Sequence, residues 1–400
     1  MAVYLDNAAT TEVRSEALDA MLPLMRGDYA NPSSAHSAGQ RARRALDAAR
    51  ARTAAALGAH PDEIVFTGSG SEADCMAIFG LSAPGASQRR HLITSAIEHH
   101  AVLHAADTLR ARGHAVTIVP VDAQGFVHAD ALAEALRARA DSAEDATMLV
   151  SIMHANNEIG TIEPIARLAA IAHEHGALFH TDAVQTAGHI PIDVAQLGID
   201  ALSLSAHKFE GPKGVGALYV RKGACVEPLI VGGAQEGGRR AGTENVAGIV
   251  GLSVALDLAV HEIASQSVHI AALRDALIDG ALALPGASLN GAREERLPNN
   301  ASLRFEGVDG QTAVLALDVA GFEASTGSAC ASGSLEPSHV LSALGLPPGQ
   351  ARGTVRFSLG RTTSADDIAR LLSRLPGTIE KLRALADALN PGGGLARARE

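Results

Sequence analysis

Lysine is rare in this chain although arginine is not, and each remaining lysine is therefore a candidate for covalent chemistry. Only four of the 33 basic residues are lysines: Lys208, Lys213, Lys222 and Lys381. A lysine amine can lose its proton and act as a nucleophile, whereas the arginine guanidinium stays protonated. Lys208 follows the apolar run 199–204 and precedes a glycine-rich stretch. This pattern predicts that Lys208 lies just past the end of a strand.

A second apolar run, residues 177–185, contains Asp182 near the expected end of another strand. An acid and a lysine at neighbouring strand ends meet the needs of pyridoxal phosphate (PLP). The lysine forms a Schiff base with the aldehyde, and the acid stabilises the protonated ring nitrogen. Asp182 alone is equally explained as a cap of its strand. Gln185 is placed to reach the phenolic oxygen, and His207 to reach the phosphate.

A phosphate-binding turn is predicted where residues 66–73 leave a strand and open a helix. Small residues such as Gly70 and Ser71 allow close approach of the backbone, and the free N–H groups of a helix start attract an anion. Ser205 and Thr243 are candidates for further hydroxyl contacts. Many strand-to-helix turns are rich in glycine and serine, so this turn indicates a phosphate site only in combination with Lys208.

Two basic residues fit the remaining tasks of such a site. His99 follows a strand end, where a neutral imidazole can stack on a pyridine ring and move protons. The alternative is an exposed histidine at the start of a helix. Arg356 lies in a strand and can hold a substrate carboxylate with two parallel hydrogen bonds. The pattern alone does not separate it from a surface arginine.

Cys330 is the candidate nucleophilic thiol among the three cysteines. Nearly all its neighbours in 325–334 are small. This composition predicts a flexible segment with an exposed thiol, which suits a nucleophile that travels. Cys75 lies in an apolar run and is expected to be buried, and Cys225 falls in a turn. The cysteine spacing indicates neither a disulfide framework nor a metal site.

The order of apolar runs predicts an α/β fold with a mostly parallel sheet covered by helices on both faces. A large cofactor domain is expected over 15–262, and a smaller α+β domain carrying the cysteine segment over 1–14 and 263–389. A long helix starting near Asn245 joins them, and residues 390–400 are expected to be a disordered tail. Strands are expected at 3–5, 64–66, 91–94, 116–119, 147–153, 177–180, 201–204, 216–220, 300–305 and 354–358, and helices at 38–57, 100–112 and 164–175.

Composition narrows the class of protein. The 400 residues are 47% hydrophobic and 19% charged, as in a globular protein with a sizeable core. The net charge of −11 argues against direct binding of nucleic acid. We find no apolar run of membrane-spanning length and no signal-peptide pattern, which predicts a cytoplasmic protein without a membrane partner.

An ordered set of motifs resembles the NifS-like (group I) cysteine desulfurases, which are PLP-dependent enzymes of fold type I. The resemblance implies an aspartate aminotransferase-like fold, with a mostly parallel seven-stranded sheet in the large domain and a smaller α+β domain. The resemblance covers nearly the whole chain except the tail. The motifs are Tyr4–Thr11, Asn31–Ser34, His154–Gly160, His180–Gln185, Ala206–Lys208, Arg240–Asn245, Gly327–Cys330, Ser334–Val340 and Val355–Leu359.

The resemblance implies a role for each candidate residue. Lys208 binds the cofactor covalently and then serves as a base, and Cys330 takes the sulfur of L-cysteine as a persulfide, which leaves L-alanine. Arg356 and Asn157 bind the substrate, and His99 stacks on the ring. Thr243 reaches the phosphate of a neighbouring subunit, which implies a homodimer. The implied cofactor contacts are Gly70, Ser71, His99, Asn157, Asp182, Gln185, Ser205, Ala206, His207, Lys208 and Thr243.

The resemblance leaves the sulfur destination open among iron–sulfur assembly, tRNA thiolation, cofactor synthesis and DNA sulfuration. Ser71 stands where the family more often has threonine, Gln235 where some members have histidine, and Gly237 where arginine is common. The stretch after Leu385 shows none of the usual docking tail for an acceptor protein. Selenocysteine lyase, another PLP lyase, and a catalytically weak sulfur-relay scaffold are the alternative functions.

Overall fold

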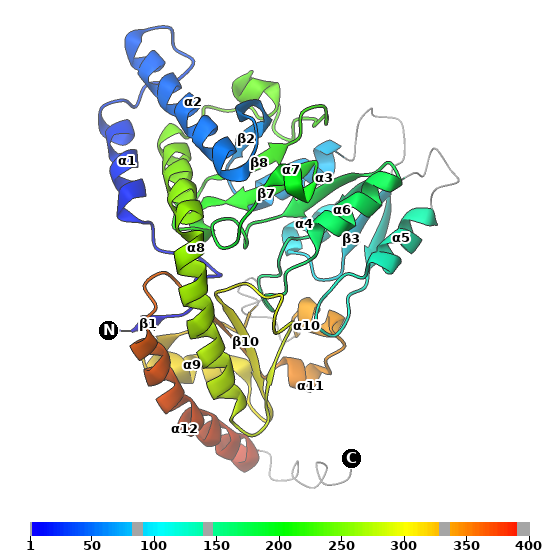
Figure 1. The fold of residues 1–400 in the computed structure, drawn as a ribbon, viewed down its shortest axis with the longest axis vertical. Helices are drawn as coiled ribbons and strands as arrows, with labels where there is room; N and C mark the ends of the chain where they lie inside the picture. The colour runs from blue at the N-terminus through cyan, green and yellow to red at the C-terminus, as the bar shows by residue number, and fades with distance from the viewer. Residues whose placement is uncertain (1, 82–90, 139–146, 328–336, 390–400) are drawn as a thin grey trace.

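The computed structural model describes residues 2–81, 91–138, 147–327 and 337–389 and contains two packed bodies (Figure 1). The larger body has a seven-stranded sheet in which β8 runs antiparallel to both its neighbours and the other pairings are parallel. This confirms the predicted mostly parallel sheet. Its strands, in spatial order, are β2 (Ile64–Thr67), β8 (Gly216–Val220), β7 (Ala201–Ser205), β6 (Leu178–Asp182), β5 (Thr147–Ser151), β3 (His91–Ser95) and β4 (Ala115–Val119).

Helices cover both faces of this sheet, and the central strands are therefore buried on both sides. Side chains alternate between faces along a strand: Phe66 joins one core, whereas Val65 joins the other. The first core also takes residues from α2 (Ser37–Leu57), α5 (Ala129–Arg137), α6 (Ile165–Glu174) and the first half of α8 (Val246–Leu282). The second takes residues from α3 (Gly70–Leu81) and α4 (His100–Ala111).

The smaller body is built on the antiparallel sheet β12–β10–β9, with β12 at Thr354–Ser358, β10 at Asn300–Phe305 and β9 at Ala287–Leu289. A parallel pair joins β1 (Val3–Tyr4) to β11 (Phe322–Glu323), so the start of the chain packs with its C-terminal third. The helices α9 (Gly310–Val319) and α12 (Ala365–Leu389) contribute to the same core. The other elements are α1 (Ser15–Arg26), η1 (Pro61–Glu63), α7 (Val194–Leu197), η2 (Ala206–Lys208), η3 (Gln235–Gly238), α10 (His339–Ala343) and α11 (Pro348–Ala351).

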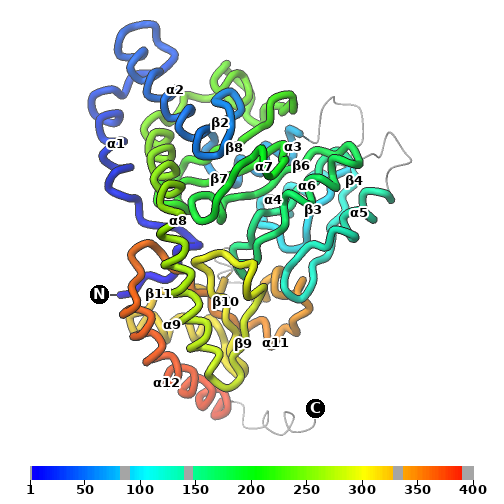
Figure 2. The backbone as a smooth tube through the Cα atoms, viewed as in Figure 1, coloured from blue at the N-terminus to red at the C-terminus, as the bar shows by residue number. Residues whose placement is uncertain are grey.

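Helix α8 passes from one body into the other, and the backbone trace in Figure 2 follows it between them. Asn245 caps its start by accepting a hydrogen bond from Gly248 N at 3.1 Å. The helix therefore begins where the sequence predicted, near Asn245. The core of the larger body includes Leu256, and that of the smaller body begins at Ile270 on this helix. The predicted boundary between 262 and 263 falls between these two contacts.

The expectation that no apolar run matches a membrane span is wrong for α8. Its length and hydropathy are sufficient for a span, and half of the most apolar window is buried inside the protein. The helix is apolar because its first part packs on α1, α2 and the sheet, and its second part packs in the smaller core. Burial on several sides therefore accounts for this composition.

Candidate cofactor and substrate site

One cavity of about 320 Å³ gathers most of the predicted site residues. It lies where the carboxyl ends of β6 and β7 meet the start of α3, which is the edge at which ligands bind in parallel sheets. Segments from the smaller body, including Arg356, complete its wall. The predicted residues that line it are Gly70, Ser71, His99, Asn157, Asp182, Gln185, Ser205, His207, Lys208 and Arg356.

Asp182 is the last residue of β6, and its Oδ1 accepts a hydrogen bond from Val184 N at 2.8 Å. Burial raises the pKa of Asp182 to about 6, although Lys208 and the Val184 N–H oppose this rise. A cation placed beside such a carboxyl favours its ionised form, because the two charges attract in a region with little water. Asp182 is therefore suited to hold a protonated ring nitrogen.

A second buried acid, Asp74 of α3, lines the same cavity and was not predicted from the sequence. Its Oδ1 has no hydrogen-bond partner among the described residues and lies 3.8 Å from His180 Nε2. Burial and the nearby Asp182 raise the pKa of Asp74 well above its ordinary value. Burial lowers the pKa of His180 to about 3, so this imidazole is neutral. The wall behind Asp182 thus holds an acid that favours its protonated form.

Lys208 reaches the start of the chain across the cavity. Its Nζ donates to Ala8 O at 2.6 Å and to Ala9 O at 2.8 Å. Gln185 Nε2 also donates to Ala8 O, at 3.0 Å. Both side chains come from segments that follow strands of the large sheet: Gln185 lies in a turn after β6, and Lys208 ends η2 after β7. The backbone at 8–9 therefore holds the amine inside the cavity.

Two histidines of the cavity are neutral. Burial lowers the pKa of His99 to about 4, and the nearby Lys208 adds to this effect. His99 Nδ1 accepts a hydrogen bond from Ala101 N at 3.1 Å, which leaves the proton of the neutral ring on Nε2. Burial and Lys208 likewise lower the pKa of His207 to about 4, and its Nδ1 lies 3.1 Å from Thr10 Oγ1. The His99 ring is therefore neutral, which is the charge state predicted for it.

The start of α3 forms the end of the cavity suited to a phosphate. A Cβ added at Gly70 would lie 2.7 Å from Val184 Cγ2 and 3.1 Å from Ser205 Cβ, so the backbone approaches its neighbours as closely as only glycine permits. Glu72 accepts from Gly68 N at 2.8 Å and pairs with Arg240 at 2.8 Å. These contacts fix the turn while the helix start faces the cavity.

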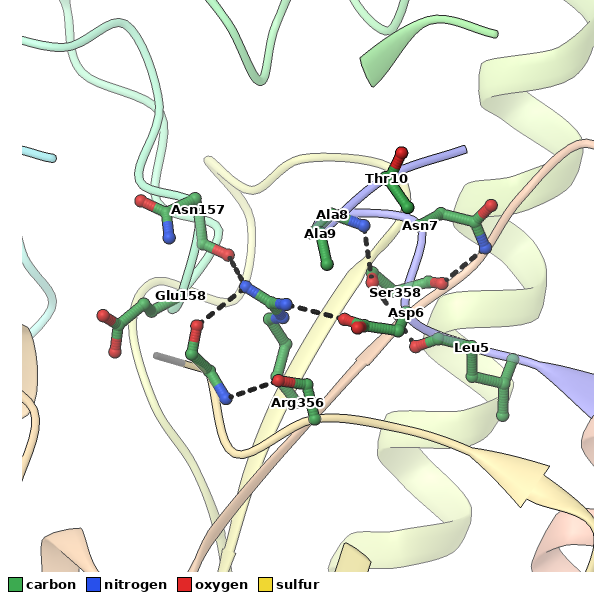
Figure 3. A network of polar contacts seen from close by, with 12 residues as sticks. Leu5, Asp6, Asn7, Ala8, Ala9, Thr10, Asn157, Glu158, Arg356 and Ser358 are labelled. Carbon is green, nitrogen blue, oxygen red and sulfur yellow. Dashed lines mark hydrogen bonds and ion pairs between the residues drawn. The ribbon is translucent and has the colours of Figure 1, made fainter. Parts of the chain in front are cut away.

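Arg356 is buried in β12 and lines the cavity, and its guanidinium lies between Asn157 and Asp6 (Figure 3). Its NH1 donates to Asn157 O and to Gly327 O, both at 2.9 Å, and its NH2 pairs with Asp6 Oδ1 at 2.7 Å. The interpretation as a surface arginine is therefore wrong, because only 1% of the residue is exposed. A buried guanidinium at this position is placed for a carboxylate ligand.

Three predicted site residues are not found on this cavity wall. Ala206 is fully buried, and its N–H donates to Val215 O at 3.2 Å. Thr243 is exposed and does not line the cavity. Cys330 lies outside the described residues, although Gly327 and His339 on either side of that segment line the cavity. Cys75 is half-buried instead of fully buried.

The sequence reasoning also missed Glu158 and Asp6. Glu158 lines the cavity, and its Oε2 accepts a hydrogen bond from Ser338 at 2.6 Å. Both acids lie in motifs that carry the family resemblance, but an acidic residue in a loop gives no sign of its partners. Their proximity to Arg356 depends on the meeting of four distant segments (Figure 3).

Comparison with known proteins gives the same fold. The profile described as aminotransferase class-V matches residues 3–371. Cysteine desulfurase IscS of Methanosarcina thermophila is 51% identical over 96% of this chain and 94% of its own length. A solved "NifS-like protein" superposes with a TM-score of 0.88 at 38% identity, over 96% of this chain and 100% of the other. The solved structure of DndA from Streptomyces lividans superposes with a TM-score of 0.74 at 37% identity, over 89% of this chain and 99% of the other. These likenesses confirm the predicted fold.

Proposed function

This chain belongs to the aminotransferase class-V family, and from that premise we propose that it is a PLP-dependent cysteine desulfurase. The resemblance to NifS-like cysteine desulfurases is confirmed by relatives named cysteine desulfurase IscS at about half identity over almost the whole chain, and by the solved NifS-like protein. The observation that carries the proposal is that Lys208, Asp182 and Arg356 line one cavity. These three supply the amine, the acid and the carboxylate-binding group that the reaction needs.

The residues present fit PLP. The buried Asp182 would hold the ring nitrogen, and the start of α3 at the close-packed Gly70 would hold the phosphate. Ser71, Ser205 and His207 are the further polar groups at that end. When bound, PLP supplies an aldehyde and a ring that withdraws electrons from the substrate.

Substrate binding and proton transfer are assigned to different side chains of the cavity. Arg356 holds the substrate carboxylate, assisted by Asn157, and Asp182 keeps the ring nitrogen protonated. Lys208 Nζ removes the proton from the substrate Cα and returns it later, because a neutral amine is a competent base. The neutral His99 ring lies beside these groups and offers a proton at Nε2.

Sulfur leaves L-cysteine through Cys330. The Cys330 thiolate forms a bond to the substrate sulfur while the bond between that sulfur and the substrate Cβ breaks. The carbon skeleton takes up protons and leaves as L-alanine, and the sulfur stays on Cys330 as a persulfide for an acceptor protein. The small residues around Cys330, and the cavity position of Gly327 next to that segment, support this role.

The function is tested by the products. Purified protein loaded with PLP and given L-cysteine with a thiol reductant is expected to form one L-alanine for each sulfide. Chromatography of the amino acids and colorimetric sulfide measurement give the two amounts. Pyruvate and ammonia in place of alanine would identify a different lyase, and the absence of any product from the loaded protein would contradict the proposal.

A single glycine substitution tests the phosphate end of the cavity. Gly70→Ala is expected to weaken PLP binding about tenfold, because the added methyl group presses against Val184 and Ser205. Titration of cofactor-free protein with PLP, followed by absorbance, gives the affinity. Gly377→Ala is the matched control, since its Cβ meets nothing within 4 Å. Equal affinities for the two variants would place the phosphate elsewhere.

The proposal includes a homodimer in the cytoplasm. Helix α1 exposes Leu18, Leu22 and Met25 along one face, and Tyr29 follows with 76% of its surface exposed. An apolar face of this kind on the surface favours an interface between subunits. Thr243, which is exposed here, is proposed to reach the phosphate of the partner subunit.

Leu22→Glu is expected to shift the protein from a dimer to a monomer of 41.0 kDa, because a charge would be buried at the contact. Light scattering after size-exclusion chromatography measures the mass. Leu315→Glu alters another exposed leucine, on α9, and should leave the dimer intact. If both variants keep the mass of two chains, α1 does not form the interface.

A further inference from the structure

Residues 4–11 carry part of the family resemblance, yet the proposed reaction uses none of their side chains. The structure places Asp6 against the substrate-binding Arg356, with Asp6 Oδ1 2.7 Å from Arg356 NH2 (Figure 3). The pair is mostly shielded, since 2% of the Arg356 side chain and 23% of the Asp6 side chain are exposed. Charge-assisted hydrogen bonds in such shielded places are short and directional.

Arg356 needs this contact to keep one orientation. A guanidinium has five N–H donors. The two on NH1 meet the carbonyl oxygens of Asn157 and Gly327, and Nε has no hydrogen-bond partner among the described residues. Asp6 is the one carboxylate that pairs with Arg356 in the part of the chain described. Without it, the arginine would be anchored by backbone carbonyls along a single edge.

Asp6 is itself fixed in place. Leu5 O accepts from Ser358 N at 2.7 Å, and Ala8 N donates to Ser358 Oγ at 2.8 Å. Asn7 Nδ2 donates to Ser358 O at 2.9 Å. Residues on both sides of Asp6 are thus tied to Ser358, which lies two positions from Arg356 on β12. The carboxylate and the guanidinium therefore share one rigid support.

We propose that Asp6 is a positioning residue that orients Arg356 for the α-carboxylate of the amino-acid substrate. The inference rests on the proposed function, in which Arg356 binds that carboxylate. The ionised Asp6 also balances the buried positive charge before substrate arrives, and an unbalanced charge in this place would be costly. Its oxygen fixes the NH2 group, so that the donors left over keep a constant direction in the cavity.

The test compares a substrate with a carboxylate and an amine without one. Asp6→Ala is expected to raise the KM for L-cysteine about tenfold, a loss of ~1.4 kcal/mol, with a smaller change in kcat. Cysteamine lacks the carboxylate, so the concentration that changes the absorbance of the bound cofactor should be the same in Asp6→Ala and the unsubstituted protein. Asp6→Asn keeps an acceptor oxygen and should give a KM between the two, and it serves as the test if Asp6→Ala does not fold.

Two further variants serve as references. Glu323→Gln removes an exposed negative charge from β11, next to the strand that leads to Asp6, and should leave both ligands unaffected. Arg356→Ala should raise the KM for L-cysteine at least as much as Asp6→Ala. Equal shifts for L-cysteine and cysteamine in the Asp6 variants would reveal general damage and overturn the positioning role. An unchanged KM in those variants, while Arg356→Ala raises it, would also overturn it. If the unsubstituted protein binds PLP but forms no alanine or sulfide from L-cysteine, the proposed function itself is wrong.

Discussion

Lys208→Ala is expected to lower the rate of alanine formation from L-cysteine about 10³-fold or more. The substitution removes both the covalent attachment of the cofactor and the base that moves the Cα proton, and a positioned base alone contributes about 10²–10⁴-fold. No other group can take its place readily, because the chain holds only three more lysines. Alanine formation is measured by amino-acid chromatography under saturating L-cysteine.

The covalent bond gives a second readout that does not depend on turnover. Borohydride treatment of the unsubstituted protein with PLP should leave a pyridoxyl group on Lys208, found by peptide mass spectrometry, and Lys208→Ala should lack it. Lys222→Ala, which changes an exposed lysine after β8, should behave as the unsubstituted protein does. A pyridoxyl group on another lysine of the unsubstituted protein would show that the cavity has been assigned to the wrong amine.

Cys330→Ala is expected to reduce sulfide release from L-cysteine about 100-fold or more, because no thiolate remains to attack the substrate sulfur. Selenium should leave selenocysteine as Se(0) without a protein thiol, and the thiol reductant in the assay then reduces it to selenide. The two substrates therefore separate a desulfurase, which loses cysteine activity alone, from a selenocysteine lyase, which never needed the thiol. Sulfide and selenide are measured with the same PLP-loaded protein.

The matched control is Cys225→Ala, because Cys225 is an exposed cysteine that does not line the cavity. It should keep full activity with both substrates. Labelling of the persulfide after one turnover, followed by mass spectrometry, should find the extra sulfur on Cys330 alone. Unchanged sulfide release by Cys330→Ala would contradict the role of this thiol, and it would point to release of sulfur directly into solution.

The strands and most cavity residues could be predicted because each depends on short stretches of sequence. Lys208 and Asp182 follow apolar runs, so their position at strand ends was readable from composition alone. The strands β9 and β11 were missed because they hold only three and two residues, too few for an alternating pattern. Asp74 was missed because its α3 stretch also predicts a core helix, and nothing local shows that it faces Asp182.

The helix α8 also shows that a local sequence pattern does not reveal distant contacts. Its long apolar pattern was correctly expected to join the two bodies, but its burial by both made it more apolar than a surface helix. The pairing of Asp6 with Arg356 spans 350 positions and depends on the register of β12 with the N-terminal segment. Contacts of this range become visible only once the chain is folded.

The contacts of residues 3–8 with β11 and β12 also set an order of events during synthesis. Val3 aligns with Phe322, and Asp6 with Ser358, so residues 3–8 have no partner strand until β11 and β12 have been synthesised. The carbonyl groups that receive the Lys208 amine lie at the end of this stretch. A nascent chain can therefore form its large sheet and still be unable to complete the cavity until β12 has been synthesised. Contacts so far apart along the chain make this closing step the slow one.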